Sequence, residues 1–246
     1  MTNRQRLDIV LEQRGLLPSR ARARDAILRG TVSVNGTKAS KPHQKVSDDD
    51  KIALSDPAAP YVSRSALKLI AGLDEGKISI VGKTCLDVGA STGGFTQVLI
   101  ERGAQKVYAV DVGHEQLHET LRTNARVTSL EGTNARDLTT DIIPDPIDIL
   151  TCDISFVSVE KVLELPLSMC GEKSNAIILI KPQFEVGREF VGRGGIVTDQ
   201  EIIDLTIARV IGFVERQGFD LLHQLPSPLS GGDGNLEVVS VFARRS

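Results

Sequence analysis

The sequence has little of what secreted, metal-binding or membrane proteins use. Its three cysteines, Cys85, Cys152 and Cys170, lie far apart and form no Cys-x-x-Cys pair, which argues against a disulfide framework and a zinc site. The longest aliphatic run, residues 176–180, is far shorter than the ~20 residues of a membrane-spanning helix. No apolar run follows the basic amino-terminal residues, as a secretory signal would require. We therefore expect a cytoplasmic protein with no metal and no membrane association.

The net charge of the chain is also small, but its charged residues are unevenly distributed. The whole chain of 246 residues carries −3, whereas residues 1–46 carry +7 and the remaining 200 residues carry −10. This asymmetry predicts a basic module for a polyanion, either nucleic acid or an anionic membrane, attached to an acidic body. With 41% hydrophobic and 25% charged residues, the chain has an ordinary globular composition and one or two domains.

The basic segment predicts two short helices followed by a hairpin. Apolar residues at helical spacing indicate a helix from about residue 7 to Gly15, and a second helix from its N-cap Ser19 to Gly30. Residues 31–34 and 51–54 are typical of strands, and Asn35-Gly36 indicates a hairpin turn. Arginines at the start of the second helix oppose its dipole unless an anion is bound, so phosphate contact is favoured over a solvated charged face.

This arrangement, over about residues 4–54, resembles the RNA-binding domain first described in ribosomal protein S-four. The resemblance rests on Arg6-Leu-Asp, Val34-Asn-Gly36, Lys41-Pro42 and the two helices. No aromatic side chain is present for base stacking, which argues for recognition of folded RNA by shape and phosphates. The residues expected to contact RNA are Arg4, Arg6, Arg14, Arg20, Arg22, Arg24 and Lys41. We expect an RNA-binding domain over residues 1–55, a semi-stiff linker over 56–63 with two prolines, and a catalytic domain over 64–246.

Beyond the linker, strand and helix patterns alternate. The pattern predicts an α/β fold with a doubly wound, mostly parallel sheet, whose site lies at the carboxyl ends of the strands. Two consecutive terminal strands with no helix between them predict an antiparallel hairpin at one edge. The expected strands are 84–88, 106–111, 127–131, 147–153, 176–180, 219–225 and 236–243, and the expected helices are 95–102, 115–122, 158–169 and 201–217.

The first strand runs into a glycine-rich loop. Asp87 precedes Gly89 by two residues, and Asp111 closes the next strand 22 residues after Gly89, where it can accept hydrogen bonds from ribose hydroxyls. A nicotinamide dinucleotide is the competing ligand, but the spacing is not Gly-x-Gly-x-x-Gly. The pattern resembles the S-adenosylmethionine pocket of class I methyltransferases, where a carboxylate lies near the cofactor's ammonium. The expected cofactor residues are Asp87, Gly89, Ala90, Ser91, Thr92, Gly93, Gly94, Phe95, Asp111, Asn134, Ala135 and Arg136.

The end of the fourth strand, Thr151-Cys-Asp-Ile-Ser-Phe156, bears on the methyl acceptor. It lacks the Asn/Asp-Pro-Pro-Tyr/Phe segment typical of enzymes that methylate exocyclic amines, so amine acceptors are disfavoured. Cys152 is a candidate nucleophile for methylation of a pyrimidine carbon, but strand alternation directs its side chain away from that of Asp153. A buried structural cysteine is the favoured interpretation.

A lysine directly follows the fifth strand. Alone, Lys181 is compatible with an ion pair to Asp153 or with a side chain that extends to solvent. Together, Lys68, Asp153, Lys181 and Glu237 resemble the Lys-Asp-Lys-Glu tetrad of FtsJ/RrmJ-type RNA 2′-O-ribose methyltransferases. The resemblance implies that these four residues are catalytic. It leaves open whether Lys181 removes the hydroxyl proton or only orients the hydroxyl oxygen.

The whole chain resembles one narrower family, the TlyA (hemolysin A-like) ribosomal RNA 2′-O-methyltransferases. The shared strings include Asp87-Val-Gly-Ala-Ser-Thr-Gly-Gly-Phe95, Asp153-Ile-Ser-Phe156 and Lys181-Pro-Gln-Phe-Glu-Val-Gly187. The resemblance implies methylation of cytidine 2′-hydroxyls in ribosomal RNA or ribosomal subunits. This chain departs from the family at Ser65-Ala66, where Gly-Gly is common. The nucleotide, the subunit and the oligomeric state stay open, and the alternatives are a non-catalytic ribosome-assembly factor and a membrane-active hemolysin.

Overall fold

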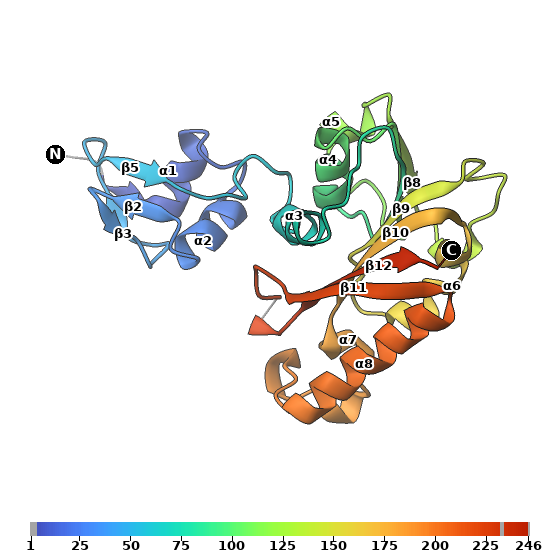
Figure 1. Ribbon diagram of the computed structural model, residues 1–246. Helices are drawn as coiled ribbons and strands as arrows, with labels where there is room; N and C mark the ends of the chain where they lie inside the picture. Colours follow the sequence, from blue (N-terminus) through green and yellow to red (C-terminus); the bar gives the residue numbers. More distant parts are fainter. Residues whose placement is uncertain (1–3, 232–233, 246) are drawn as a thin grey trace. The chain divides into compact units, whose positions relative to one another are not determined.

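The chain forms two units, residues 1–60 and 61–246 (Figure 1). Apolar side chains of each unit pack into cores of their own. The computed structural model describes residues 4–231 and 234–245. In that part of the chain, no helix is both long and apolar enough to cross a membrane.

The first unit is built from two helices and two small sheets. Ser19 caps the second helix as predicted, because its hydroxyl accepts from the backbone N–H of Arg22 at 3.3 Å. Asn35 and Gly36 both have positive φ, 51° and 81°, as the predicted two-residue hairpin turn requires. The elements are α1 (Leu7–Gln13), α2 (Arg20–Leu28), the pair β1 (Gln5–Arg6) and β4 (Lys45–Val46), and the sheet β3 (Thr37–Lys38), β2 (Val32–Val34) and β5 (Ile52–Leu54).

Residues 55–60 pack as part of this unit. The Asp56 carboxylate is buried and accepts two hydrogen bonds from the Arg29 guanidinium, at 2.9 and 2.6 Å. Ala58 is completely buried, and its carbonyl accepts from Arg22 Nη2 at 2.7 Å. These contacts extend the first unit into the segment for which the two prolines predict a connector.

The second unit contains a seven-stranded sheet in the order β11-β12-β10-β9-β6-β7-β8. Its five parallel strands are β6 (Thr84–Val88), β7 (Lys106–Asp111), β8 (Val127–Glu131), β9 (Ile147–Cys152) and β10 (Cys170–Ile180). The last two strands, β11 (Phe219–Pro226) and β12 (Val238–Arg244), form an antiparallel pair at one edge. This arrangement confirms the predicted α/β fold with its terminal hairpin.

Helices cover both faces of the sheet. Residues of β10 alternate between the two cores: Ile177 and Leu179 join the core that contains α3 and α4, whereas Ile178 and Ile180 join the core that contains α6 and α8. The elements are α3 (Ala66–Glu75), α4 (Gly94–Glu101), α5 (Glu119–Arg122), α6 (Glu164–Ser168), α7 (Pro182–Glu185) and α8 (Gln200–Arg216), with the 3₁₀ turns η1 (Ala135–Asp137), η2 (Val159–Lys161), η3 (Arg188–Phe190) and η4 (Arg193–Gly195).

Two predicted helices are wrong in extent. The helix predicted over 115–122 is only the single turn of α5, since Glu115 has a φ of 54°, outside the helical region. The helix predicted over 158–169 divides into η2 and α6. A continuous helix would place Pro166 in its interior, where proline lacks an N–H and clashes with the preceding turn, whereas α6 accommodates Pro166 in its first turn.

Candidate active site

Two adjoining cavities lie where the parallel strands end. The larger has a volume of about 540 Å³ and the smaller about 160 Å³. Gly89, Ser91, Asp153 and Ser155 line both, so the cavities are neighbours across the loop that follows β6. This is the position in which doubly wound sheets bind ligands.

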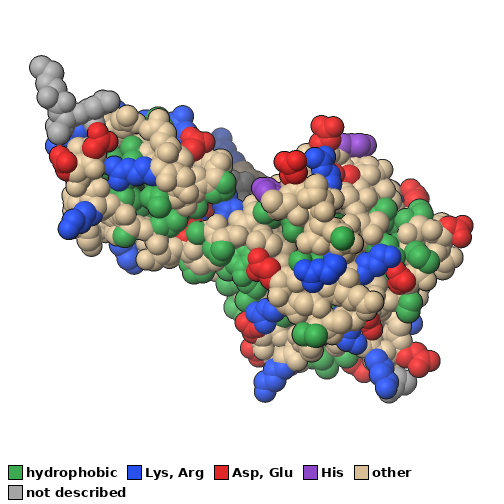
Figure 2. All heavy atoms as spheres, turned by 90° about the horizontal axis from the view of Figure 1, so that it is seen from above, with side chains coloured by type: hydrophobic (Ala, Val, Ile, Leu, Met, Phe, Trp, Pro, Cys, Tyr) green, Lys and Arg blue, Asp and Glu red, His purple; other side chains and the backbone are tan. Residues whose placement is uncertain are grey.

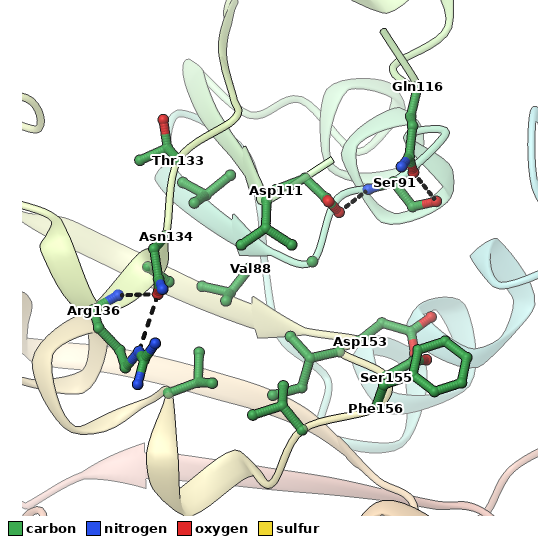
Figure 3. A pocket seen from close by; sticks show the side chains of 17 residues that line it. Val88, Ser91, Asp111, Gln116, Thr133, Asn134, Arg136, Asp153, Ser155 and Phe156 are labelled. Carbon is green, nitrogen blue, oxygen red and sulfur yellow. Dashed lines mark hydrogen bonds between the residues drawn. The ribbon is translucent and has the colours of Figure 1, made fainter. Parts of the chain in front are cut away.

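The larger cavity combines an acid with an apolar surface (Figure 3). Both oxygens of the Asp111 carboxylate accept backbone N–H groups, from Ser91 and Gly113, each at 2.8 Å. These bonds fix the carboxylate and leave further lone pairs for a ligand. Asn134 Oδ1 accepts from the backbone N–H and the Nε of Arg136, at 3.0 and 3.2 Å. Apolar lining comes from Val88, Val110, Val112, Ile154 and Val162, which suits a flat heterocycle.

Gly89 brings the backbone close to the floor of both cavities. Its φ is +82°, and a Cβ built there would lie 2.9 Å from Ile154 Cγ2 and 3.0 Å from the Asp153 carbonyl oxygen. Only glycine therefore fits this position. Of the other predicted cofactor residues, those that line a cavity are Ala90, Ser91, Thr92, Phe95, Asp111, Asn134, Ala135 and Arg136.

Asp87, Gly93 and Gly94 do not line either cavity. The Asp87 carboxylate is completely buried and accepts from the hydroxyls of Thr96, at 2.6 Å, and Thr151, at 2.9 Å. It thereby links β6 to α4 and β9 behind the glycine loop. Burial raises the pKa of Asp87 to about 6, against the opposing effect of the two hydroxyl donors.

This raised pKa predicts a pH-dependent stability. The pKa of Asp87 in the folded protein, about 6, exceeds the reference value of 3.8. The stability that protonated Asp87 contributes to the fold is therefore fully present below pH 3.8 and is lost as the pH rises through 6. Relative to the wild type, Asp87→Asn should gain about 2 kcal/mol in unfolding free energy between roughly pH 4.5 and roughly pH 7.5. Chemical denaturation at the two pH values measures this, with the exposed Asp141→Asn as control. An equal difference between variant and wild type at both pH values would contradict it.

The four predicted catalytic residues form two ion pairs, in which both lysines and Glu237 are buried and Asp153 is half-buried. Lys181 Nζ lies 2.6 Å from Asp153 Oδ1 and donates to Ser155 Oγ at 2.9 Å. Lys68 Nζ pairs with Glu237 Oε2, although 169 residues separate them in sequence. Asp153 and Lys181 line the smaller cavity, whereas Lys68 and Glu237 line neither cavity.

The sheet explains why these residues meet. Asp153 directly follows β9 and Lys181 directly follows β10, two neighbouring parallel strands. Glu237 directly precedes β12, whose Val238 is paired with Ile180, so Glu237 and Lys181 continue an antiparallel register. Lys68 lies on α3, which packs on β10 and β12 through Gly72, where a Cβ would lie 2.9 Å from Val239 and 3.0 Å from Ile177.

Comparisons with known proteins agree with this geometry. A model of FtsJ-like methyltransferases matches residues 61–244, and a model of the S4 domain matches residues 5–52. The chain is 41% identical to the 16S/23S rRNA (cytidine-2′-O)-methyltransferase TlyA of Mycobacterium tuberculosis, over 96% of this chain and 89% of that protein. The chain belongs to the TlyA family of FtsJ-like methyltransferases.

Two further relatives share this family's architecture. The chain is 39% identical to Hemolysin A of Brachyspira hyodysenteriae, over 96% of this chain and 99% of that protein. The solved structure of a proposed hemolysin from Streptococcus thermophilus is 34% identical and superposes with a TM-score of 0.77, covering 100% of this chain and 90% of that one. The predicted family and the predicted class, a methyltransferase, are confirmed.

In this TlyA-family chain, several of the basic residues predicted to contact RNA have partners within the S4 domain. Arg6 and Arg20 both pair with the buried Asp8, at 2.9 and 3.0 Å, and the hydrogen bond from Arg6 is the main reason that the pKa of Asp8 falls to about 2. Arg22 donates to the Ala58 carbonyl, and Arg14 donates to the Asp48 carbonyl at 3.3 Å. The exposed members are Arg4, Arg14, Arg20, Arg24 and Lys41.

Most of the exposed basic residues lie on segments near the start of α1 or α2, whereas Arg14 lies at the end of α1. Arg6 pairs with Lys45 between β1 and β4, and the backbone N–H of Asp8 donates to the Pro42 carbonyl, which brings residues 41–46 beside the start of α1. Arg20 joins α2 to the same place through Asp8, and Arg24 follows one turn later. On the face seen in Figure 2, basic side chains lie at separate places on the surface, with neutral and acidic side chains between them. The S4 domain thus presents separate cations at spaced positions.

Sequence reasoning missed several residues of the TlyA-family site. Ser63 and Ser65 line the smaller cavity, and the Ser65 hydroxyl donates to the Ser63 hydroxyl at 3.0 Å. The departure from the family's glycines was the available signal, because a side chain at Ser65 reaches toward Gly94, whose added Cβ would lie 2.4 Å from Ser65 Oγ. Phe156 lines the larger cavity and is 90% exposed with a φ of 67°; no sequence pattern indicates this conformation.

The structure also bears on carbon methylation through Cys152 and on metal binding. Cys152 is completely buried, and burial raises the pKa of its thiol well above its usual value, so the structure supports a structural cysteine. Over residues 4–231 and 234–245, no group of three or more His, Cys, Asp or Glu side chains is arranged to hold a metal ion.

Proposed function

We propose that this chain transfers a methyl group from S-adenosylmethionine to the 2′-hydroxyl of a cytidine in ribosomal RNA, in the cytoplasm where ribosomes are assembled. The observation that supports this most strongly is the pairing of two buried lysines with two carboxylates at the end of β10, next to a cavity of about 160 Å³. The activity named for the TlyA relative of Mycobacterium tuberculosis supports the choice of acceptor.

The larger cavity fits S-adenosylmethionine. Asp111 would accept hydrogen bonds from the ribose hydroxyls, and Asn134, Val112 and Ile154 would surround the adenine. The close backbone approach at Gly89 suits the link between the nucleoside and the methionine portion, which would extend into the smaller cavity toward Ser91 and Thr92. When bound, the cofactor supplies an electrophilic methyl group on a sulfonium.

Lys181 is the group best placed to act on the acceptor hydroxyl. Asp153 and Ser155 occupy two of its bonding directions, at 2.6 and 2.9 Å, and fix the position of Nζ at the smaller cavity. The remaining direction is either a lone pair that accepts the hydroxyl proton or an N–H that orients the hydroxyl oxygen. Glu237 holds the second lysine, Lys68, near this centre. The protein contributes positioning of oxygen and methyl in addition to proton transfer.

An assay with purified components tests this function. Ribosomal subunits or RNA without the modification would be incubated with the protein and methyl-labelled S-adenosylmethionine, then digested and analysed by mass spectrometry. We expect label in 2′-O-methylcytidine. Label on a base, or on a protein, would contradict the proposal, as would its complete absence when the protein binds both RNA and cofactor.

Gly89 provides a test of the cofactor site. Gly89→Ala should weaken binding of S-adenosylmethionine by about 10-fold or more, because the new Cβ would press on Ile154 and the Asp153 carbonyl and a positive φ costs about 1–2 kcal/mol for alanine. Isothermal titration calorimetry measures the dissociation constant. Gly212→Ala on α8 is the control, since its Cβ would meet only Arg216 Nη1 at 3.5 Å. Unchanged affinity in Gly89→Ala would place the cofactor elsewhere.

A further inference from the structure

Glu185 is a buried acid that lines neither cavity. It lies at the end of α7 and is only 9% exposed. Its Oε2 accepts from the Ser158 hydroxyl at 2.6 Å, and its Oε1 accepts from the backbone N–H of Val159 at 2.8 Å. A buried carboxylate is costly unless it is well bonded, and both of these donors come from one short segment.

That segment, residues 153–159, is here named the rim loop. It connects β9 to η2, and its members Asp153, Ser155 and Phe156 line the larger cavity. β9 fixes its beginning, and Glu185 fixes its end. Between these points, Lys181 holds Ser155, and the Phe184 ring packs on the Phe156 ring with centroids 4.9 Å apart. The rim loop is thus tied to residues 181–185 at three successive positions.

The rim loop needs such restraint. Phe156 has a φ of 67°, a left-handed conformation that is unfavourable for a residue with a bulky side chain. The residue is 90% exposed, so little burial offsets the strain. Strain of this kind persists only where the surroundings fix the backbone. The paired hydrogen bonds to Ser158 and Val159 lie two and three residues after Phe156 and provide that fixation.

We propose that Glu185 is a positioning residue for methyl transfer, which clamps the rim loop so that Ser155 and Phe156 keep their places beside Lys181. The inference rests on the proposed function for its effect on rate, but not for the clamp itself. Arg209, from α8, supports Glu185 from behind: its Nη2 donates to the Glu185 carbonyl at 2.8 Å and lies 3.9 Å from the carboxylate. Other charged groups near this carboxylate are Glu160, which pairs with Arg209, and Lys161.

The test uses the absence of tryptophan from the sequence. Phe156→Trp introduces a single tryptophan into the rim loop, and the anisotropy of its selectively excited fluorescence reports the mobility of the loop. In this background, Glu185→Ala should lower the anisotropy clearly, and Ser158→Ala, which removes one of the two bonds, should lower it less. Glu185→Gln should restore most of it, because an amide can accept from Val159 and donate to the Ser158 oxygen. The exposed Glu172→Ala on β10 is the control and should change nothing.

The same substitutions in the otherwise wild-type chain test the consequence for catalysis. Glu185→Ala should lower kcat by about 10- to 100-fold, with less than about a 3-fold change in the KM for RNA and in the dissociation constant for S-adenosylmethionine. Glu185→Gln should recover most of the rate. If Glu185→Ala does not fold, Ser158→Ala carries the test with a smaller effect in the same direction.

Unchanged anisotropy in Glu185→Ala, or a loss of cofactor affinity as large as the loss of kcat, would overturn the proposal and leave Glu185 a purely structural residue. The two proposals fail separately. If the wild-type protein does not methylate RNA, the proposed function fails, while the anisotropy measurements still decide whether Glu185 clamps the rim loop.

Discussion

Lys181→Ala should lower the rate of 2′-O-methylation by about 10²- to 10⁴-fold, the usual contribution of a positioned acid or base, while RNA affinity stays unchanged. The reason is that Lys181 Nζ is the group fixed at the smaller cavity, by Asp153 and Ser155. Single-turnover kinetics with saturating cofactor and RNA measure the rate, and a filter-binding assay measures the affinity.

Two further variants sharpen this result. Lys173→Ala, an exposed lysine at the opposite end of β10, is the control for loss of a lysine and should keep the full rate. Lys181→Arg separates the two roles left open for Lys181, because a guanidinium can orient a hydroxyl but does not give up its proton. A rate near that of Lys181→Ala supports proton removal, and substantial recovery supports orientation. Near wild-type methylation by Lys181→Ala would refute the assignment of this residue.

Simultaneous replacement of Arg4, Arg24 and Lys41 by glutamine should weaken RNA binding by roughly 10- to 100-fold at physiological salt. These residues are exposed, whereas Arg6 and Arg20 also hold the buried Asp8, so their loss would mix binding with folding. Each lost phosphate contact should reduce the slope of log K against log salt by about one. Binding measured over a series of salt concentrations gives both quantities.

A matched triple variant in the methyltransferase domain provides the control. Lys77, Arg102 and Lys173 are exposed and lie at the ends of α3 and α4 and at the start of β10, away from the cavities. Replacing them with glutamine should leave the salt dependence unchanged, and neither triple variant should alter cofactor affinity. If both triple variants weakened RNA binding equally, the charge asymmetry of the sequence would not identify the RNA-binding domain.

The fold was predictable because its main signals are local. Buried parallel strands are short aliphatic runs, and Ile177–Ile180 is such a run because its residues enter the cores on both faces of the sheet. Helix lengths were less predictable. Apolar spacing over residues 158–169 suggests one helix, but Pro166 makes the cost of a continuous helix too high, and the chain uses two shorter elements instead.

The site was predictable only in part. Lys68 and Glu237 are 169 residues apart, and no local sequence pattern indicates that they are in contact. Only the family resemblance predicts that they share a site, and the sheet register explains why they meet. Asp87 shows the opposite case. Its position two residues before Gly89 indicated a ligand contact, yet its side chain is enclosed by Thr96 and Thr151, while the neighbouring Val88 lines the larger cavity. Strand alternation decides which of two adjacent residues faces the ligand.

The conformation of the rim loop could not be predicted from the sequence, for a different reason. A positive φ at Phe156 has no propensity signal, since bulky residues rarely adopt it. It becomes interpretable only once the contacts of Ser155 with Lys181 and of Ser158 with Glu185 are known.

The central claim is most directly tested by mapping ribose methylation on ribosomal RNA from cells with and without the gene for this chain. We expect a cytidine 2′-O-methyl group to disappear on deletion, to return with the wild-type gene, and to stay absent with a gene that carries Lys181→Ala. An identical methylation map in the presence and absence of the gene would contradict the claim.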